Sequence, residues 1–287
     1  MGNPAHSLPT PSTQAGREGL AALLARPSRA AIALDFDGTL ADIVPDPEQS
    51  RAHPGVVPAL SALAPLVAAV AVITGRPADT AVRYGGFAGA PGLEHLVVLG
   101  HYGAERWDAA TGAVTAPAPD LGVQAVRAEL PAVLEERGAG ADSGTWIEEK
   151  GGRAVAVHTR RAADPHATFA ALRAPLSELA ARHGLIVEPG RLVLELRPPG
   201  VDKGVALEEY VKAVGAETVL YAGDDLGDLA AYAAVDKLRA QGLTGLLVCS
   251  GTEVPELAER ADLLLAGPAA VADLLGELAG HLRPESD

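Results

Sequence analysis

The chain has 287 residues, of which 48% are hydrophobic, and a formal net charge of −14 at pH 7. This length and apolar content suit one large or two medium folded domains. The negative charge argues against a nucleic-acid surface and against an anionic membrane surface, because both would repel it. We therefore expect a small-molecule partner, no nucleic acid and no membrane.

The first 18 residues are rich in Pro, Ser, Thr and Gly and lack the basic start and apolar core of a secretory signal. We expect them to form a disordered tail. The apolar stretch Gly19–Ala25 is too short for a bilayer span, which needs about 20 apolar residues. A single cysteine, Cys249, cannot form an internal disulfide and fits a reducing compartment. We expect a cytoplasmic protein, and a composition this rich in alanine permits a monomer.

Short apolar runs rich in β-branched residues predict buried parallel strands along the chain. They are Ala30–Leu34, Val67–Ile73, Leu96–Leu99, Thr218–Ala222 and Gly245–Val248. Stretches of helical length lie between them, at Gly55–Pro65, Lys203–Val214 and Asp228–Arg239. This alternation predicts an α/β fold with an open parallel sheet, whose ligand site lies beyond the carboxyl ends of the strands.

The segment Ala104–Arg197 breaks this alternation. It contains helical stretches at Leu121–Glu136 and Ala167–His183, and strand-like stretches at Arg153–Thr159, Leu185–Val187 and Leu192–Leu196. This order predicts a β-α-β-β-α-β insertion with a core of its own. We therefore expect a core domain made of residues 19–103 and 201–287, and an inserted α/β cap at residues 104–200.

Two carboxylates, Asp35 and Asp37, follow the first predicted strand in the sequence DFDGT. Strand alternation points both side chains to the same side. Mg²⁺ prefers oxygen ligands, so one carboxylate and a backbone carbonyl of this loop are candidate ligands, and the second carboxylate is available for proton transfer. Taken alone, the pair is equally typical of a polar turn after a strand.

Four short sequences resemble, in chain order, the motifs of the haloacid dehalogenase superfamily. They are DFDGT at 35–39, ITGR at 73–76, DKG at 202–204 and GDDLGD at 223–228. The resemblance implies a Rossmann-like core with a parallel sheet and an inserted α/β cap of type C2. It also implies a Mg²⁺-dependent phosphatase that works through a phospho-aspartyl intermediate.

The resemblance assigns roles to single residues. Asp35 would be the nucleophile, and Asp37 the general acid and then the general base. Thr74, with Gly75 and Arg76, would bind the phosphoryl group, and Lys203 would neutralise its charge. Asp35, Asp37 and Asp224 would hold Mg²⁺, while Asp225 and Asp228 would support these ligands or cap a helix.

The predicted cap resembles the trehalose-phosphate phosphatases in three places: EEK at 148–150, AVAVHTR at 154–160, and ELRP at 195–198. This resemblance implies that Glu148, Lys150 and Glu195 hydrogen-bond sugar hydroxyls. An ion-pair ladder on an exposed strand is the alternative interpretation of such residues. The chain departs from the family at GHYG, residues 100–103, where many members read GSHG, and at Gly227 and Leu229, which replace Thr and Glu.

The expected activity is the hydrolysis of trehalose 6-phosphate to trehalose and inorganic phosphate. The nearest alternative is a phosphatase of the same mechanism for another sugar phosphate, such as a trehalose-like pseudo-disaccharide phosphate of the validoxylamine type. A phosphosugar mutase ranks lower, because residues 40–73 leave no room for the small cap of family mutases. A non-catalytic sensor is disfavoured by the presence of Asp35, Asp37, Lys203 and Asp224.

Overall fold

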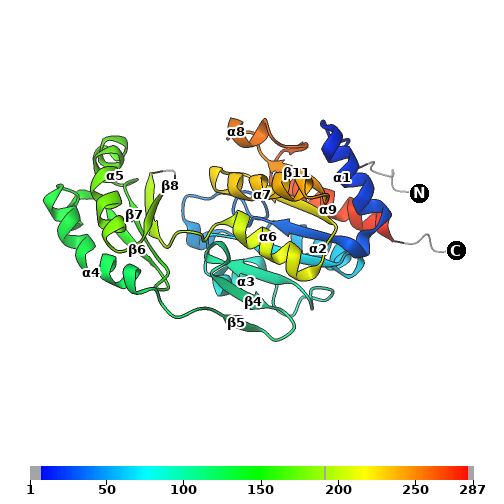
Figure 1. Ribbon diagram of the computed structural model, residues 1–287, viewed down its shortest axis with the longest axis horizontal. Helices are drawn as coiled ribbons and strands as arrows, with labels where there is room; N and C mark the ends of the chain where they lie inside the picture. Colours follow the sequence, from blue (N-terminus) through cyan, green and yellow to red (C-terminus); the bar gives the residue numbers. More distant parts are fainter. Residues whose placement is uncertain (1–7, 191, 284–287) are drawn as a thin grey trace. The chain divides into compact units, whose positions relative to one another are not determined.

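The structure is a computed structural model that describes residues 8–190 and 192–283. The chain forms two compact units (Figure 1). One comprises the chain up to Thr115 and from Asp202 onward, and the other comprises Ala116–Val201.

An eight-stranded sheet runs through the larger unit in the order β12-β11-β10-β1-β2-β3-β4-β5. The first six strands in this order are parallel, and β4 and β5 continue the sheet as an antiparallel hairpin. The strands are β1 (Ala30–Leu34), β2 (Ala69–Ile73), β3 (Val97–Gly100), β4 (Glu105–Asp108), β5 (Ala113–Thr115), β10 (Thr218–Gly223), β11 (Thr244–Ser250) and β12 (Leu263–Leu265).

Helices cover both faces of this sheet, because its central strands are apolar on both sides. In β1, Ile32 and Leu34 belong to the core under α1, α2, α3 and α9, while Ala31 and Ala33 belong to the core under α6 and α7. The helices are α1 (Gln14–Ala25), α2 (Val56–Leu63), α3 (Ala78–Gly85), α6 (Lys203–Val214), α7 (Leu229–Ala240), α8 (Pro255–Ala258) and α9 (Pro268–Leu282). Short 3₁₀ turns connect them at η1 (Pro27–Arg29), η2 (Pro47–Gln49), η3 (Ala64–Leu66), η4 (His101–Gly103) and η6 (Leu226–Asp228).

The smaller unit has a four-stranded antiparallel sheet in the order β6-β7-β9-β8 with two helices packed on one face. Its elements are α4 (Leu121–Glu136), η5 (Ala141–Ser143), β6 (Trp146–Lys150), β7 (Ala154–His158), α5 (Pro165–Arg182), β8 (Ile186–Gly190) and β9 (Val193–Arg197). Val155, Val157, Leu194 and Leu196 fill the core under the helices. The alternate residues of the same strands form the opposite, polar face.

The expected α/β fold with a parallel sheet and an inserted α/β unit is confirmed. The expected tail at residues 1–18 is wrong where the structure describes it, because α1 begins at Gln14. Thr13 caps this helix by accepting a hydrogen bond from Gly16 N–H. Residues 1–7 lie outside the described part of the chain.

The boundary expected at residues 103 and 104 lies instead between Thr115 and Ala116. The segment that follows β3 turns back as β4 and β5, so it belongs to the large sheet. The order of helices and strands in the inserted unit is consequently α-β-β-α-β-β. The unit begins with α4 and not with the strand that was expected. No helix within residues 8–190 and 192–283 is long and apolar enough to cross a bilayer.

Candidate active site

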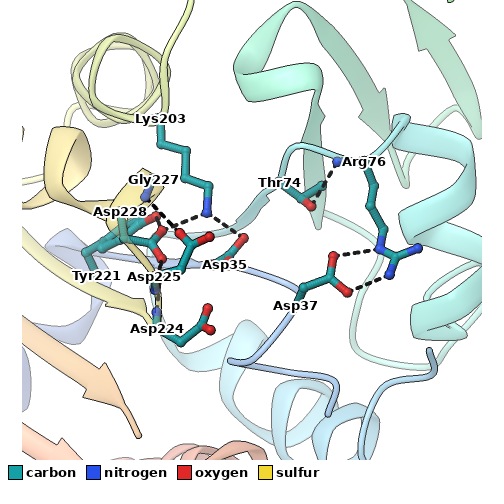
Figure 2. A network of polar contacts seen from close by, with 10 residues as sticks. All are labelled: Asp35, Asp37, Thr74, Arg76, Lys203, Tyr221, Asp224, Asp225, Gly227 and Asp228. Atoms are coloured by element: carbon teal, nitrogen blue, oxygen red, sulfur yellow. Dashed lines mark hydrogen bonds and ion pairs between the residues drawn. The ribbon is translucent and has the colours of Figure 1, made fainter. Parts of the chain in front are cut away.

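The polar residues that follow β1, β2 and β10 meet at one edge of the large sheet. Parallel pairing places Leu34, the last residue of β1, beside Ala222 of β10 and Val72 of β2. The chain therefore leaves three neighbouring strands at the same level, and Figure 2 shows the resulting group of side chains.

The loop after β1 is held by backbone contacts. Asp35 N–H donates to Ala222 O at 2.8 Å, which continues the ladder of the sheet by one residue. Gly38 has φ +75°, and a Cβ at this position would collide with the Asp224 carboxylate. Ser250 Oγ donates to Gly38 O at 2.7 Å. The sharp turn thus needs glycine both for its conformation and for the close approach of Asp224.

Lys203 lies at the centre of a buried ion-pair cluster. Its Nζ contacts Asp35 Oδ1 at 2.8 Å and Asp228 Oδ1 at 2.7 Å. Lys203 is the first residue of α6, where the helix dipole disfavours a positive charge, and it is buried. Both features cost stability unless carboxylates neutralise the ammonium group, so the position favours a role in charge handling over a role in stability.

Asp228 anchors the loop after β10 with both carboxylate oxygens. Oδ1 accepts hydrogen bonds from Lys203 Nζ and, at 2.6 Å, from Tyr221 Oη. Oδ2 accepts from Asp224 N–H at 2.9 Å and Asp225 N–H at 3.1 Å. Asp225 in turn accepts from Gly227 N–H at 2.8 Å and caps η6. These bonds fix the loop that carries Asp224.

Burial dominates the electrostatics of these carboxyl groups. It raises the pKa of Asp35 well above its usual range, although Lys203 acts to lower it. Burial, reinforced by the charges of Asp228 and Asp225, raises the pKa of Asp224 to about 8. Burial also acts to raise the pKa of Asp228, but the charge of Lys203 and the hydrogen bonds from Lys203, Tyr221 and Asp225 N–H together outweigh it, and the pKa is lowered. The site therefore holds more negative charge than it neutralises.

A divalent cation fits this arrangement. Oxygens of Asp35, Asp224 and Asp228 lie within 4.8 Å of one another. Three carboxylates against the one ammonium of Lys203 leave two negative charges to neutralise. Asp224 Oδ1 is buried, and no other described residue hydrogen-bonds to it. An all-oxygen set of this kind suits a hard cation such as Mg²⁺.

Asp37 does not join this cluster. Its carboxylate accepts two parallel hydrogen bonds from Arg76, from Nε to Oδ2 and from Nη2 to Oδ1, both 2.6 Å long (Figure 2). Ser50 Oγ also donates to Asp37 Oδ1, at 3.3 Å. Asp35 and Asp37 thus have different partners, Lys203 for one and Arg76 for the other.

The turn after β2 brings Thr74 to the same edge of the sheet. Thr74 is buried, and its Oγ1 accepts from Arg76 N–H at 3.2 Å. A Cβ on Gly75 would lie 2.8 Å from Tyr102 Oη, so a side chain here would force the tyrosine ring to shift. Tyr102 itself has φ +59° and donates its N–H to Thr74 O at 2.9 Å. The departure at residues 100–103 therefore contacts the predicted phosphoryl-binding turn directly.

The three predicted sugar ligands lie together on the polar face of the small sheet. Lys150 Nζ forms an ion pair with Glu195 Oε2, and Glu148 Oε2 contacts His158 Nε2 at 2.7 Å. Register places Glu148 of β6 and Glu195 of β9 on either side of Ala156 of β7. The structure agrees with both interpretations. The three residues lie on one polar face, and they are also engaged in ion pairs, Lys150 with Glu195 and Glu148 with His158.

Sequence reasoning missed several residues that position the site. Tyr221 lies inside a strand and was counted as core, although a buried phenol needs a hydrogen-bond partner and could have been flagged for that reason. Ser50 and Ser250 come from distant segments, and no local pattern points to them. Arg76 was assigned to the phosphoryl group, whereas its described contacts include both oxygens of Asp37.

Solved structures of other proteins share the fold of this chain. The C-terminal domain of trehalose-6-phosphate phosphatase from C. albicans matches with a TM-score of 0.72 at 19% identity, covering 96% of this chain and 99% of that one. A haloacid dehalogenase-like hydrolase from Bacteroides thetaiotaomicron matches with a TM-score of 0.59 at 19% identity, covering 86% and 98%. These likenesses confirm the expected fold.

Comparison of the sequence with known sequences identifies the family. A trehalose-phosphate phosphatase of Mycolicibacterium paratuberculosis is 35% identical over 266 residues, which are 88% of this chain and 62% of that protein. The chain thus spans less than two thirds of the curated relatives that it matches, with 62% of this phosphatase and 18% of a longer mycobacterial protein. The profile of the family described as trehalose-phosphatase matches residues 33–263. The resemblance seen in the sequence is confirmed, and the chain belongs to the trehalose-phosphatase family.

Proposed function

We propose that this chain hydrolyses trehalose 6-phosphate to trehalose and inorganic phosphate, with Asp35 as the nucleophile. The observation that carries the proposal is the pairing of Asp35 with Lys203 at the edge of the sheet, at 2.8 Å, in a chain of this family. Phosphoryl transfer needs an oxygen nucleophile in line with the leaving group and cations around the phosphoryl oxygens.

In the first step, Asp35 attacks the phosphorus atom while the bond to the sugar oxygen breaks. Asp37 in its acid form donates its proton to that oxygen, so that the sugar leaves as a neutral alcohol. Lys203 and the Thr74 hydroxyl stabilise the charge on the phosphoryl oxygens. The product of this half-reaction is a phosphorylated Asp35.

In the second step, Asp37 as a carboxylate accepts a proton from water, whose oxygen attacks the phosphorus atom. The bond to Asp35 breaks, phosphate leaves, and Asp37 is again an acid. Mg²⁺ would be held by Asp35, Asp224 and the backbone carbonyl of Asp37, and it supplies positive charge that stabilises the transferred group. Asp228 and Asp225 hold the loop that presents Asp224.

We propose that residues 116–201 act as the cap that selects the sugar. Glu148, Lys150 and Glu195 would exchange some of their mutual contacts for sugar hydroxyls, which both donate and accept hydrogen bonds. The converging arrangement of Glu148 and Glu195 on one face of the small sheet supports this assignment.

The test is phosphate release with Mg²⁺ across trehalose 6-phosphate, glucose 6-phosphate, sucrose 6-phosphate and a trehalose-like pseudo-disaccharide phosphate, with a chelator control. We expect a strong, chelator-sensitive preference for trehalose 6-phosphate. A preference for another of these esters would keep the mechanism and reassign the sugar, and activity on none of them would contradict the proposal.

A further inference from the structure

Arg76 is held in place by contacts on several sides. Its Nη1 donates to Pro47 O at 3.0 Å, while Nε and Nη2 both bond to the Asp37 carboxylate. The guanidinium carbon lies 5.3 Å from the centre of the Tyr84 ring and 5.8 Å from that of Phe36. Only 15% of the side chain is exposed. The plane and position of the guanidinium group are therefore set by the protein around it.

The two bonds to Asp37 are of the strong, geometry-specific kind. Two parallel N–H···O contacts at 2.6 Å between a guanidinium and a carboxylate fix both the position and the rotation of the carboxylate. Oδ1 also accepts from Ser50 Oγ, whereas Oδ2 accepts only from Arg76 Nε among residues 8–190 and 192–283. Oδ2 consequently keeps a lone pair with which a proton can be exchanged.

We propose that Arg76 is a positioning residue for Asp37 and not a ligand of the substrate phosphoryl group. This inference rests on the proposed function, because it assigns Asp37 the two proton transfers. Three of the five guanidinium N–H donors point to Asp37 and Pro47. Releasing Asp37 in order to bind phosphate would leave a carboxylate that is one-third exposed without its strongest partner.

Arg76 would act in both half-reactions through the same contacts. When Asp37 gives its proton to the leaving sugar oxygen, the new carboxylate is already paired with the guanidinium group. When Asp37 takes a proton from the attacking water, the carboxylate is held in the same orientation. Arg76 itself neither gains nor loses a proton, and no bond is formed to it.

The proposal predicts a dependence on the leaving group. A sugar alkoxide needs a proton to leave, whereas nitrophenolate leaves without one, so the first half-reaction with p-nitrophenyl phosphate does not need a positioned acid. The variants are Arg76→Gln and Arg76→Lys, since lysine keeps the charge but cannot make two parallel bonds. The matched control is Arg83→Gln, because Arg83 is exposed and also lies over the Tyr84 ring, at 5.1 Å.

We expect both Arg76 variants to lower kcat on trehalose 6-phosphate by about 10²-fold, within the range for loss of a proton-transfer group. KM should change little, and the rapid burst of nitrophenolate from p-nitrophenyl phosphate should remain before slow turnover. Arg83→Gln should match the wild type. The double variant Arg76→Gln with Asp37→Asn should be no slower than Asp37→Asn alone.

Other results would overturn the inference. A lost burst with a raised KM, restored by lysine, would make Arg76 a phosphate ligand. If the Arg76 variants were as active as Arg83→Gln, Arg76 would have no role in positioning Asp37. The same would follow if the double variant lost activity by the product of the two single losses. A wild-type protein inactive on every ester would instead overturn the proposed function, and the role of Arg76 with it. Circular dichroism melting curves verify that each variant is folded.

Discussion

The buried charges of the large unit and the paired charges of the small sheet differ in how completely the protein fixes them. Lys203 has two carboxylate partners, and Asp228 accepts four hydrogen bonds at zero exposure. In the small sheet, Glu195 is also buried and paired with Lys150, but the Glu148 side chain is 49% exposed, and its contacts include His158. The first region is built to hold one geometry, whereas the proposed sugar binding requires the second to exchange partners, which the exposure of Glu148 favours.

This contrast follows from where each set of residues lies. The larger unit places its charges after central strands of a sheet that is covered on both faces, so each charge needs a partner within the protein. The smaller unit has helices packed on one face of its sheet, and Glu148, Lys150 and Glu195 lie on the opposite face. We therefore expect substitutions in the first region to affect stability and turnover, and substitutions in the second to affect substrate affinity.

The largest expected effect is that of Asp228→Asn. The amide cannot neutralise Lys203, and its nitrogen cannot accept the hydrogen bonds that the replaced oxygen accepts. Breaking one partner of a buried ion pair costs about 3–5 kcal/mol, so we expect a loss of that order in the free energy of unfolding, together with loss of turnover. Urea unfolding measures it. A loss below about 1 kcal/mol is the usual cost at an exposed ion pair. Such a loss would contradict the claim that the charges of the larger unit are more firmly held than those of the small sheet.

Gly38→Ala and Gly86→Ala separate backbone strain from the effect on the site. Both glycines have positive φ, at +75° and +67°, but an added Cβ meets Asp224 at Gly38 and open space at Gly86. We expect Gly86→Ala to cost about 1 kcal/mol and to keep full activity. Gly38→Ala should cost more and should weaken Mg²⁺ activation. Equal stability and equal Mg²⁺ dependence of the two variants would contradict this account of the loop.

Glu195→Gln tests the small sheet. Losing a hydrogen bond to a charged group costs about 1.5–3 kcal/mol, so we expect KM for trehalose 6-phosphate to rise about tenfold or more. Hydrolysis of p-nitrophenyl phosphate, which carries no sugar, should be unchanged. The matched control is Glu129→Gln, because Glu129 pairs with Arg182 at 2.8 Å on the exposed surface of the same unit. Equal losses on both esters would place Glu195 outside sugar recognition.

The smallest expected effect is a dependence of stability on pH in the presence of a chelator. The pKa values of Asp35 and Asp224, the latter about 8, are raised in the folded protein. The folded state therefore binds more protons than the unfolded state between the usual aspartate range and about pH 8, and stability falls as pH rises through this window. Excess Mg²⁺ should reduce the fall, and Asp224→Asn should flatten it. A melting temperature that rises over the same window would contradict the charge excess of the cluster.

The sequence was most informative where a buried strand ends in a polar residue. The runs that became β1 and β10 are buried throughout, and each is followed directly by a carboxylate. These carboxylates mark the edge of the sheet, and Asp35 and Asp224 could be placed there. Helix α6 was equally predictable, because Asp202 caps its start and Gly215 ends it in the left-handed conformation.

Long-range pairing was not predictable. Strands β4 and β5 have three or four residues each, and β5 is exposed throughout, so neither gives a clear alternation of polar and apolar residues. Their membership of the large sheet depends on pairing with β3. The Asp37–Arg76 pair joins residues 39 positions apart, and only the folded chain shows that the two side chains meet.

The most direct test of the central claim is to identify the residue that carries phosphate during turnover. Quenching the Mg²⁺-loaded protein in acid with trehalose 6-phosphate, reducing with borohydride and mapping peptides by mass spectrometry would reveal an acyl phosphate as a reduced aspartate. We predict modification at Asp35 alone, and none in Asp35→Asn, which should fold but not turn over. Turnover by Asp35→Asn, or a phosphorylated residue elsewhere in the chain, would contradict the account.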